Sequence, residues 1–157
     1  RIWYCRTLSD SDSILLWWSI HMLTHTNYSR TEIEAVIKLS PEKRYTYFIK
    51  RICDWELIWT LYEDDSIILN EGKNGELYMI LFPFIDFASY YVTKTKEMSG
   101  SLCKSFELEE FLNTTLGNLQ SHNINKALIF PVPNEFGLNV SVSKLIEDIN
   151  KELENYK

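Results

Sequence analysis

Acidic and aromatic residues gather in the central third of this 157-residue chain, where they could support either catalysis or binding. Asp54 and Glu56 flank Trp55, and residues 63–65 form a run of three acids. A glycosidase-like acid pair needs one carboxylic acid held in an apolar cleft, whereas consecutive acids at the tip of a predicted hairpin are solvated. The run also lacks the alternating ligand spacing of a Ca²⁺ loop. We therefore assign these acids no catalytic role.

Histidines, cysteines and glycines give little support for nucleophilic catalysis or for metal binding. His21 and His25 lie four residues apart, but no Glu stands between them in a His-Glu-x-x-His pattern. His122 follows a predicted helix end, where a cation complements the helix dipole. The sequence has no glycine-rich phosphate loop and no Cys-x-x-Cys pair among Cys5, Cys53 and Cys103. We predict no catalytic residues, no metal and no cofactor, and an enzyme is not the favoured interpretation.

Aromatic residues set among acids have the composition of an interface hot spot with a polar rim. Asp54 ends a predicted helix, where a negative charge is unfavourable unless Arg44, Arg51 or backbone N–H groups pair with it. An alternative is a small enzyme or ligand-binding domain, with a pocket near Arg44, Asp54 and Pro83. The candidate residues for ligand or partner binding are Arg44, Asp54, Trp55, Trp59, Asp64, Asp65 and Phe84.

The charge of the chain points to the kind of partner. Sixteen Lys and Arg against twenty-two Asp and Glu give a net charge of −6. Residues 1–40 hold equal numbers of basic and acidic residues, so the imbalance lies after them. Such a surface repels nucleic acid and anionic lipid and attracts a basic protein. The most apolar run, residues 14–23, is too short to span a membrane. We expect a basic protein partner, no nucleic acid and no membrane, and the odd, scattered cysteines favour the cytoplasm.

The elements that position these residues can be predicted from caps and periodicity. Ser40 and Pro41 mark the clearest helix start, and Asn74-Gly75 is a strong hairpin turn. We predict an α+β class with a largely antiparallel sheet of about five strands packed with three main helices. The strands are 56–62, 66–70, 76–82, 127–132 and 138–142, the main helices are 41–54, 107–120 and 143–155, and a shorter helix covers 85–92.

Residues 1–38 are predicted to be an N-terminal helical extension, with helices at about 13–24 and 29–38, followed by a single α+β domain over 39–157. We expect this extension to make few long-range contacts and to be dispensable or foreign to the native protein. The opposing physical argument is that Trp17, Trp18 and their apolar neighbours are costly to leave in water.

Three stretches of the chain follow a recognisable pattern. They are Arg44-Tyr45-x-Tyr47-Phe48-Ile49-Lys50 with its flanks from Leu39 to Tyr62, then Phe82 to Ala88, then Phe130-Pro131-Val132-Pro133 with Gly137, Val140 and Leu145. The chain resembles the bacterial family called domain of unknown function 2750 over about residues 39–155. That family tends to carry Trp-Pro-His where this chain has Phe82-Pro83-Phe84, so if the family's histidine has a chemical role, this chain lacks it. The resemblance implies a domain start near residue 39 and no activity.

Small size, acidity and aromatics near acids together predict a non-enzymatic interaction protein. Its sharpest form is an immunity or inhibitor protein that binds a basic toxin or nuclease, because charge complementarity gives such inhibitors their association rate and specificity.

Overall fold

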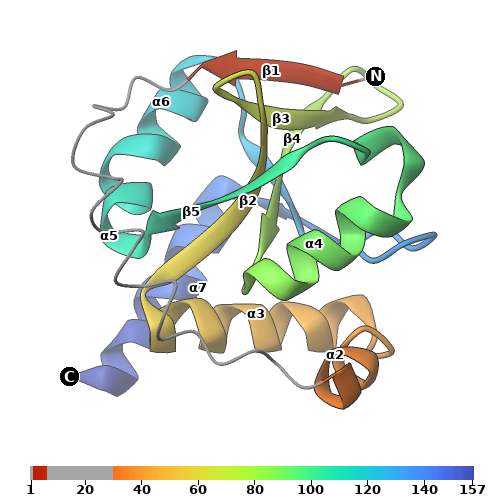
Figure 1. Cartoon of the computed structure of the whole chain (residues 1–157). Coiled ribbons are helices and arrows are strands. Elements are labelled where there is room, and N and C mark those ends of the chain that lie inside the picture. The colour runs from red at the N-terminus through yellow and green to blue at the C-terminus, as the bar shows by residue number, and fades with distance from the viewer. Residues whose placement is uncertain (1, 7–29) are drawn as a thin grey trace, which may run out of the picture.

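The computed structural model describes residues 2–6 and 30–157, and for residues 2–6 it describes the backbone alone. The class is α+β, as predicted: a seven-stranded, mostly antiparallel sheet with helices packed around it (Figure 1). The strands are β1 (Ile2–Arg6), β2 (Leu57–Glu63), β3 (Ser66–Glu71), β4 (Leu77–Phe82), β5 (Leu102–Glu107), β6 (Lys126–Ile129) and β7 (Leu138–Ser141).

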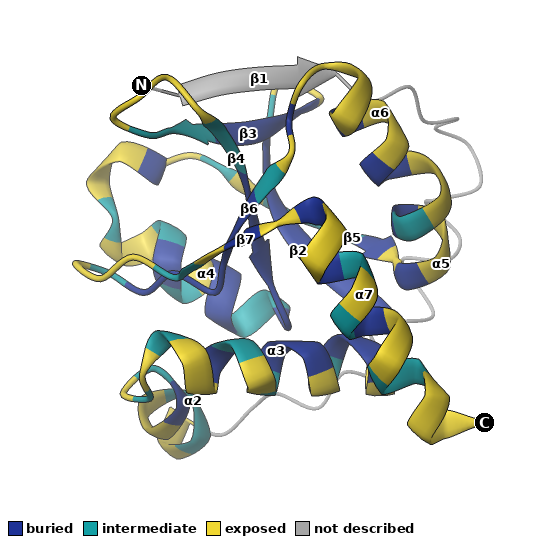
Figure 2. Ribbon diagram, turned by 180° about the vertical axis from the view of Figure 1, so that it is seen from behind, coloured by how far each residue is buried: buried dark blue, intermediate teal, exposed yellow. Residues whose placement is uncertain are grey.

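The longest helices are α3 (Pro41–Trp55), α7 (Val142–Leu153) and α4 (Ile85–Lys94), and α2 (Arg30–Val36) precedes α3. A further helical run consists of α5 (Leu108–Glu110), a π-helical stretch (Phe111–Thr115) and α6 (Leu116–Ser121). Short 3-10 turns occupy Lys96–Met98 and Glu154–Tyr156. In Figure 2 the buried residues of α3 and α7 face the sheet and their exposed residues face away from it.

The strand order is β1-β3-β2-β4-β6-β7, with β5 paired to β2 beside this path. β4 and β6 run parallel, and the other described strand pairs are antiparallel. The β2–β5 ladder runs from Leu57 opposite Glu107 to Tyr62 opposite Leu102. This register brings the start of β2 next to the end of β5, although the two segments lie far apart in the sequence.

The helices α3 and α7 each begin after a serine N-cap, which sets the first residue of the helix. Ser40 Oγ accepts a hydrogen bond from the Lys43 backbone N–H at 3.4 Å, and Phe48 and Ile52 on α3 are fully buried. The cap of the last helix, α7, is Ser141 and not the predicted Ser143. Ser141 Oγ accepts a hydrogen bond from the Lys144 backbone N–H at 3.2 Å. The helix faces are as predicted, and the start of the last helix moves by about one half turn.

The sheet has more strands than the sequence predicted. β5 was not predicted because it is short and its residues are mostly half-buried or exposed, so it has no clear apolar alternation. The strand predicted over 127–132 ends at Ile129. Phe130 still donates its N–H to the Leu81 carbonyl at 2.8 Å, but its left-handed φ of 49° turns the chain away from β4 after this bond. Pro83 follows β4 and precedes α4, as predicted.

The N-terminal segment contains a strand where a wholly helical extension was predicted. β1 pairs antiparallel with β3 from Ile2 opposite Asn70 to Arg6 opposite Ser66. α2 agrees with the predicted helix at 29–38, and its Val36 joins the core. The helix predicted at 13–24 lies outside the described residues. That residues 1–38 are dispensable stays a prediction.

Candidate functional site

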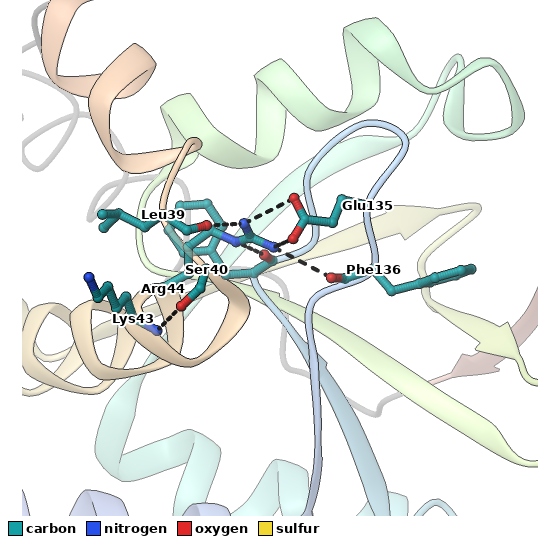
Figure 3. A network of polar contacts seen from close by, with 7 residues as sticks. Leu39, Ser40, Lys43, Arg44, Glu135 and Phe136 are labelled. Carbon is teal, nitrogen blue, oxygen red and sulfur yellow. Dashed lines mark hydrogen bonds and ion pairs between the residues drawn. The ribbon is translucent and has the colours of Figure 1, made fainter.

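Arg44 is fully buried, and its guanidinium group connects α3 to the loop between β6 and β7. Its Nε donates to the Phe130 carbonyl at 3.1 Å, Nη1 to the Leu39 carbonyl at 2.5 Å, and Nη2 to the Phe136 carbonyl at 3.4 Å. Nη2 also lies 3.4 Å from the carboxylate of Glu135 (Figure 3). These protein acceptors offset the cost of burying the charge, so Arg44 is a structural anchor.

Asp54 lies on the surface near the end of α3 and pairs with Arg51 at 3.7 Å, which is one of the three partners that the sequence offered. Ten residues of helix separate it from Arg44, a distance of about 15 Å along the axis. Pro83 is buried. The structure therefore does not bring Arg44 and Asp54 into one cleft, and the alternative of a ligand pocket beside them has no geometric support.

Trp55 is the one predicted aromatic site residue that reaches the surface, with 38% of the residue exposed. Its ring stands edge-on to the ring of Phe84, with 6.1 Å between the centroids. Phe84 is 5% exposed and Trp59 is 6% exposed, so both belong to the core. Trp55 is thus a partly exposed ring that packs against a buried aromatic residue, Phe84.

Asp64 and Asp65 form the two-residue turn between β2 and β3. Their φ values of 48° and 58° are those of a type I′ hairpin turn, and both residues are exposed. The turn lies at the opposite end of β2 from Trp55, roughly 20 Å away for a strand of this length. Apart from Trp59 and Phe84, which belong to the core, the predicted site residues therefore lie in three places: the Arg44 anchor, the end of α3, and this turn.

A pocket of about 390 Å³ opens beside Trp55 at the end of α3. We call it the acidic pocket, because three exposed glutamates, Glu56, Glu107 and Glu109, line it. Its other lining residues are Trp55, Leu57, Leu108, Leu112, Asn113 and Leu153. The chain assembles it from the α3–β2 junction, the β5–α5 junction, the π-helical stretch and the end of α7.

Backbone pairing between two junctions builds this pocket. The β2–β5 register sets Leu57 opposite Glu107, and the Leu108 N–H donates to the Glu56 carbonyl at 2.9 Å. Glu107 and Glu109 were not predicted as site residues, because nothing local in the sequence links them to Trp55. The available signal was the cluster of acids at 107–110 where a helix was predicted to begin.

Two irregular backbone segments border the acidic pocket. Glu56 has a left-handed φ of 53°, a conformation that is uncommon for residues other than glycine. The π-helical stretch Phe111–Thr115 supplies Leu112 and Asn113 to the lining, and π-helical turns are frequent at functional sites. Both irregularities place side chains around the same hollow.

Comparison with known proteins assigns the chain to a family. A family model described as "Protein of unknown function (DUF2750)" matches residues 45–149, which is more than half of the chain. The chain belongs to the DUF2750 family. No curated protein and no solved structure matches this DUF2750 chain. The matched span begins in α3 and ends in α7, so it includes every lining residue of the acidic pocket except Leu153.

A second surface hollow of this DUF2750 protein, about 500 Å³, lies between α3 and α7. Tyr45 Oη donates to the Asp148 carboxylate at 2.7 Å, and Lys144 Nζ donates to the same carboxylate at 2.5 Å. Burial and this hydrogen bond raise the pKa of Tyr45. The Tyr45–Asp148 hydrogen bond connects the two helices, and the Lys144–Asp148 pair lies within α7, so these contacts have a structural role.

Two kinds of site are absent from residues 2–6 and 30–157 of the DUF2750 chain. Within them, no group of three or more His, Cys, Asp or Glu is arranged to hold a metal ion. In the same part of the chain, no helix has the length and apolarity needed to cross a bilayer.

Proposed function

We propose that this protein is a non-enzymatic interaction module that binds a basic protein partner, as an immunity or inhibitor protein does. The observation that carries the proposal is the acidic pocket, where an exposed tryptophan stands beside Glu56, Glu107 and Glu109. Tryptophan is enriched among the residues that dominate binding energies, and a charged rim supplies specificity.

Trp55 suits the role of an anchor because its position is set before binding. Its edge-on contact with Phe84 holds the ring, and Phe84 is itself packed against Phe87. A side chain already ordered in the free protein loses little conformational entropy when a partner covers it. The exposed part of Trp55 is therefore available for binding at low cost.

The chemistry of the pocket matches a lysine or arginine side chain. The apolar stem of such a residue can pack against Trp55 and Leu112, while its cationic head meets the glutamates at the rim. A cation over a tryptophan ring adds a further attraction. The net charge of −6 extends the same preference to longer range, which speeds the approach of a basic protein.

A cytoplasmic location is part of the proposal. Cys53 and Cys103 carry free thiols, which suits a reducing compartment. Cys53 is 3% exposed, and burial raises the pKa of its thiol to about 12, so it is protonated and unreactive at neutral pH.

The test begins with co-purification from the native host at low salt, followed by binding measurements with the purified partner. The pocket variant carries Glu107→Gln and Glu109→Gln. The matched control carries Asp64→Asn and Asp65→Asn, which removes the same charge at the distant turn, where asparagine tolerates the left-handed backbone. We expect the pocket variant to weaken binding about tenfold and the control to change Kd less than about twofold.

Three outcomes contradict the proposal. Equal weakening by the pocket variant and the control would mean that net charge acts without a defined site, and would return Asp64 and Asp65 to the list of candidate contacts. A chain that retains no protein partner at low salt would leave the pocket without its proposed ligand. Binding that does not weaken as salt is raised would also contradict a basic partner, since surface electrostatics are screened by salt.

A further inference from the structure

The loop between β6 and β7, residues 130–137, is held more firmly than a surface connection requires. Val132 and Glu135 exchange two backbone hydrogen bonds, each of 3.1 Å. Between them, Pro133 and Asn134 occupy the centre of the turn, and Asn134 has a φ of 65°. Proline followed by a residue with positive φ is the signature of a type II turn.

Contacts outside the loop fix its conformation further. Arg44, which is fully buried, donates to the carbonyls of Phe130 and Phe136 and pairs with Glu135. Gly137 closes the loop, and a Cβ atom there would lie 2.0 Å from the Ile129 carbonyl oxygen, so only glycine fits. The loop therefore has one conformation, which a buried charge and a required glycine both maintain.

What this rigid loop presents to solvent is Phe136. The residue is 77% exposed, whereas Phe130 at the start of the same loop is fully buried in the core. Figure 3 shows the Phe136 ring pointing away from the Arg44 network, while its carbonyl points toward it. An exposed phenylalanine contributes nothing to the core, but an aromatic ring on an ordered loop is an effective anchor for binding.

We infer that Phe136 is an interaction anchor that inserts into an apolar cleft of a protein partner whose rim is basic. The basic rim follows from charge: the protein carries a net charge of −6, and the neighbouring Glu135, although its carboxylate pairs with Arg44, keeps 50% of its side chain exposed. A second copy of this chain or an anionic lipid surface fits less well, because each would bring negative charge toward a protein of net charge −6.

This anchor is separate from the acidic pocket and does not depend on it. Arg44 holds the loop near the N-terminal end of α3, and the pocket lies at the C-terminal end. A helix of 15 residues spans about 22 Å, so one partner would need to cover that distance to reach both places. The two surfaces can therefore be tested independently.

Photocrosslinking from position 136 tests the inference in the intact protein. Phe136 is replaced by p-benzoylphenylalanine and the variant is irradiated in native host cells. Leu102, which is 69% exposed on β5, carries the same probe in a matched control. We expect a crosslink to one heterologous protein from position 136 and none to that protein from position 102. The crosslinked position on the partner must lie in an apolar cleft bordered by Lys or Arg.

Binding of the purified pair then measures the contribution of the ring. We expect Phe136→Ala to weaken binding about thirtyfold, as for an interface hot spot, with unfolding unchanged because the ring is exposed. Pro133→Gly keeps the ring but loosens the turn, and we expect it to weaken binding about threefold to tenfold by removing preorganisation.

Several results would overturn the inference. They are a crosslink to a second copy of the chain, a crosslink to lipid, labelling no stronger than from position 102, or full affinity in Phe136→Ala. Repeating the crosslink in the Glu107→Gln, Glu109→Gln background separates the two proposals. A crosslink that persists there, with the pocket variant binding normally, would support the loop and contradict the pocket.

Discussion

The two ends of α3 differ in how their charged groups are used. At the N-terminal end, Arg44 is fully buried and its guanidinium group donates hydrogen bonds to three backbone carbonyls. At the C-terminal end, the carboxylates that line the acidic pocket beside Trp55 are exposed. Both ends combine charged and aromatic residues, and on the sequence alone Arg44, Asp54 and Trp55 were predicted to belong to one candidate site. The first end uses its charge to fix the protein's own loop. The second leaves its charge accessible, and only accessible charge can recognise a partner.

The comparison shows that the composition of a segment does not distinguish an anchor from a binding surface. The distinction depends on whether each charged group forms its hydrogen bonds within the protein or leaves them available to a partner. For Arg44 it is directed at Leu39, Phe130 and Phe136 within the same molecule. Variants at the two ends of α3 should therefore affect different properties, stability at one end and binding at the other.

The largest expected effect is that of Arg44→Met, which we expect to lower the free energy of unfolding by about 3–5 kcal/mol. Methionine fills part of the volume, but it leaves buried carbonyls without donors and removes the partner of Glu135. Urea unfolding of this variant is compared with Arg51→Met, whose side chain is 37% exposed and pairs with the exposed Asp54. We expect the control to lose less than about 1 kcal/mol. Similar losses in the two variants would remove the contrast between a buried anchor and a surface pair.

Deleting residues 1–38 tests how far the Arg44 anchor depends on what precedes it. The deletion ends immediately before Leu39, whose carbonyl accepts a hydrogen bond from Arg44, and it removes the buried side chain of Val36. The deletion also removes β1, which pairs with β3 over five residues. We expect the truncated domain to fold with a loss of more than about 2 kcal/mol, because the burial of Val36 alone is worth about that much and the β1–β3 pairing is lost as well. Thermal unfolding measures it. A truncated chain that no longer unfolds cooperatively would show that this segment is part of the domain.

The pH dependence of stability offers a smaller test near the same end of α3. Burial raises the pKa of Asp148, but hydrogen bonds from Lys144 and Tyr45 outweigh it, so the pKa in the folded protein lies below its ordinary value. A carboxyl with a lowered folded pKa stabilises the fold above its unfolded pKa of about 3.9, and this contribution is lost as the pH falls through the folded pKa.

Asp148→Asn should therefore destabilise the protein by about 1 kcal/mol at pH 7, and the difference should shrink as the pH falls through the folded pKa of Asp148. Urea unfolding of both proteins at about five pH values between about pH 2 and pH 7 measures this difference in the free energy of unfolding. A difference that stays constant over this range would mean that the charge on Asp148 does not contribute.

The smallest effect, of opposite sign, is expected at the C-terminal end. Glu56 ends α3 in a left-handed conformation that glycine adopts without strain. Glu56→Gly should raise the free energy of unfolding by about 0.5–1 kcal/mol, while it weakens binding of the basic partner. Stability and affinity are measured on the same preparation. A variant that is less stable than the parent would contradict the view that Glu56 is kept for its side chain.

Much of the fold could be predicted because its signals are local. The Ser40 cap, the Asn74-Gly75 turn and the apolar faces of α3 and α7 are each encoded within a few residues, and the structure has them where they were predicted or within a few residues. β5 could not be predicted, because its pairing with β2 is a long-range contact and its residues show no clear alternation.

The candidate site was harder to predict for the same reason. Trp55 and Glu56 were visible as a local cluster, but Glu107 and Glu109 join them only through the β2–β5 register. Arg44 was predicted as a partner of Asp54 and as part of a pocket near Asp54 and Pro83, and nothing in its neighbours indicates that the loop at 130–137 will accept its hydrogen bonds instead. Phe136 was not singled out, since an exposed phenylalanine in a turn has no sequence signature of its own.

The parallel pairing of β4 with β6 has a consequence for how the chain folds. β2, β3 and β4 form sequence-adjacent antiparallel strands, and β6, β7 and α7 form a second local unit. The two units meet where Tyr78 to Leu81 pair with Lys126 to Ile129, which closes a loop over everything between them. Such closure costs entropy before any contact repays it, so we expect this joining step to limit the folding rate. The hydrogen bonds from Arg44 on α3 to Phe130 and Phe136 connect the second unit to a helix that precedes the first, so we expect the Arg44 anchor to form only as the two units join.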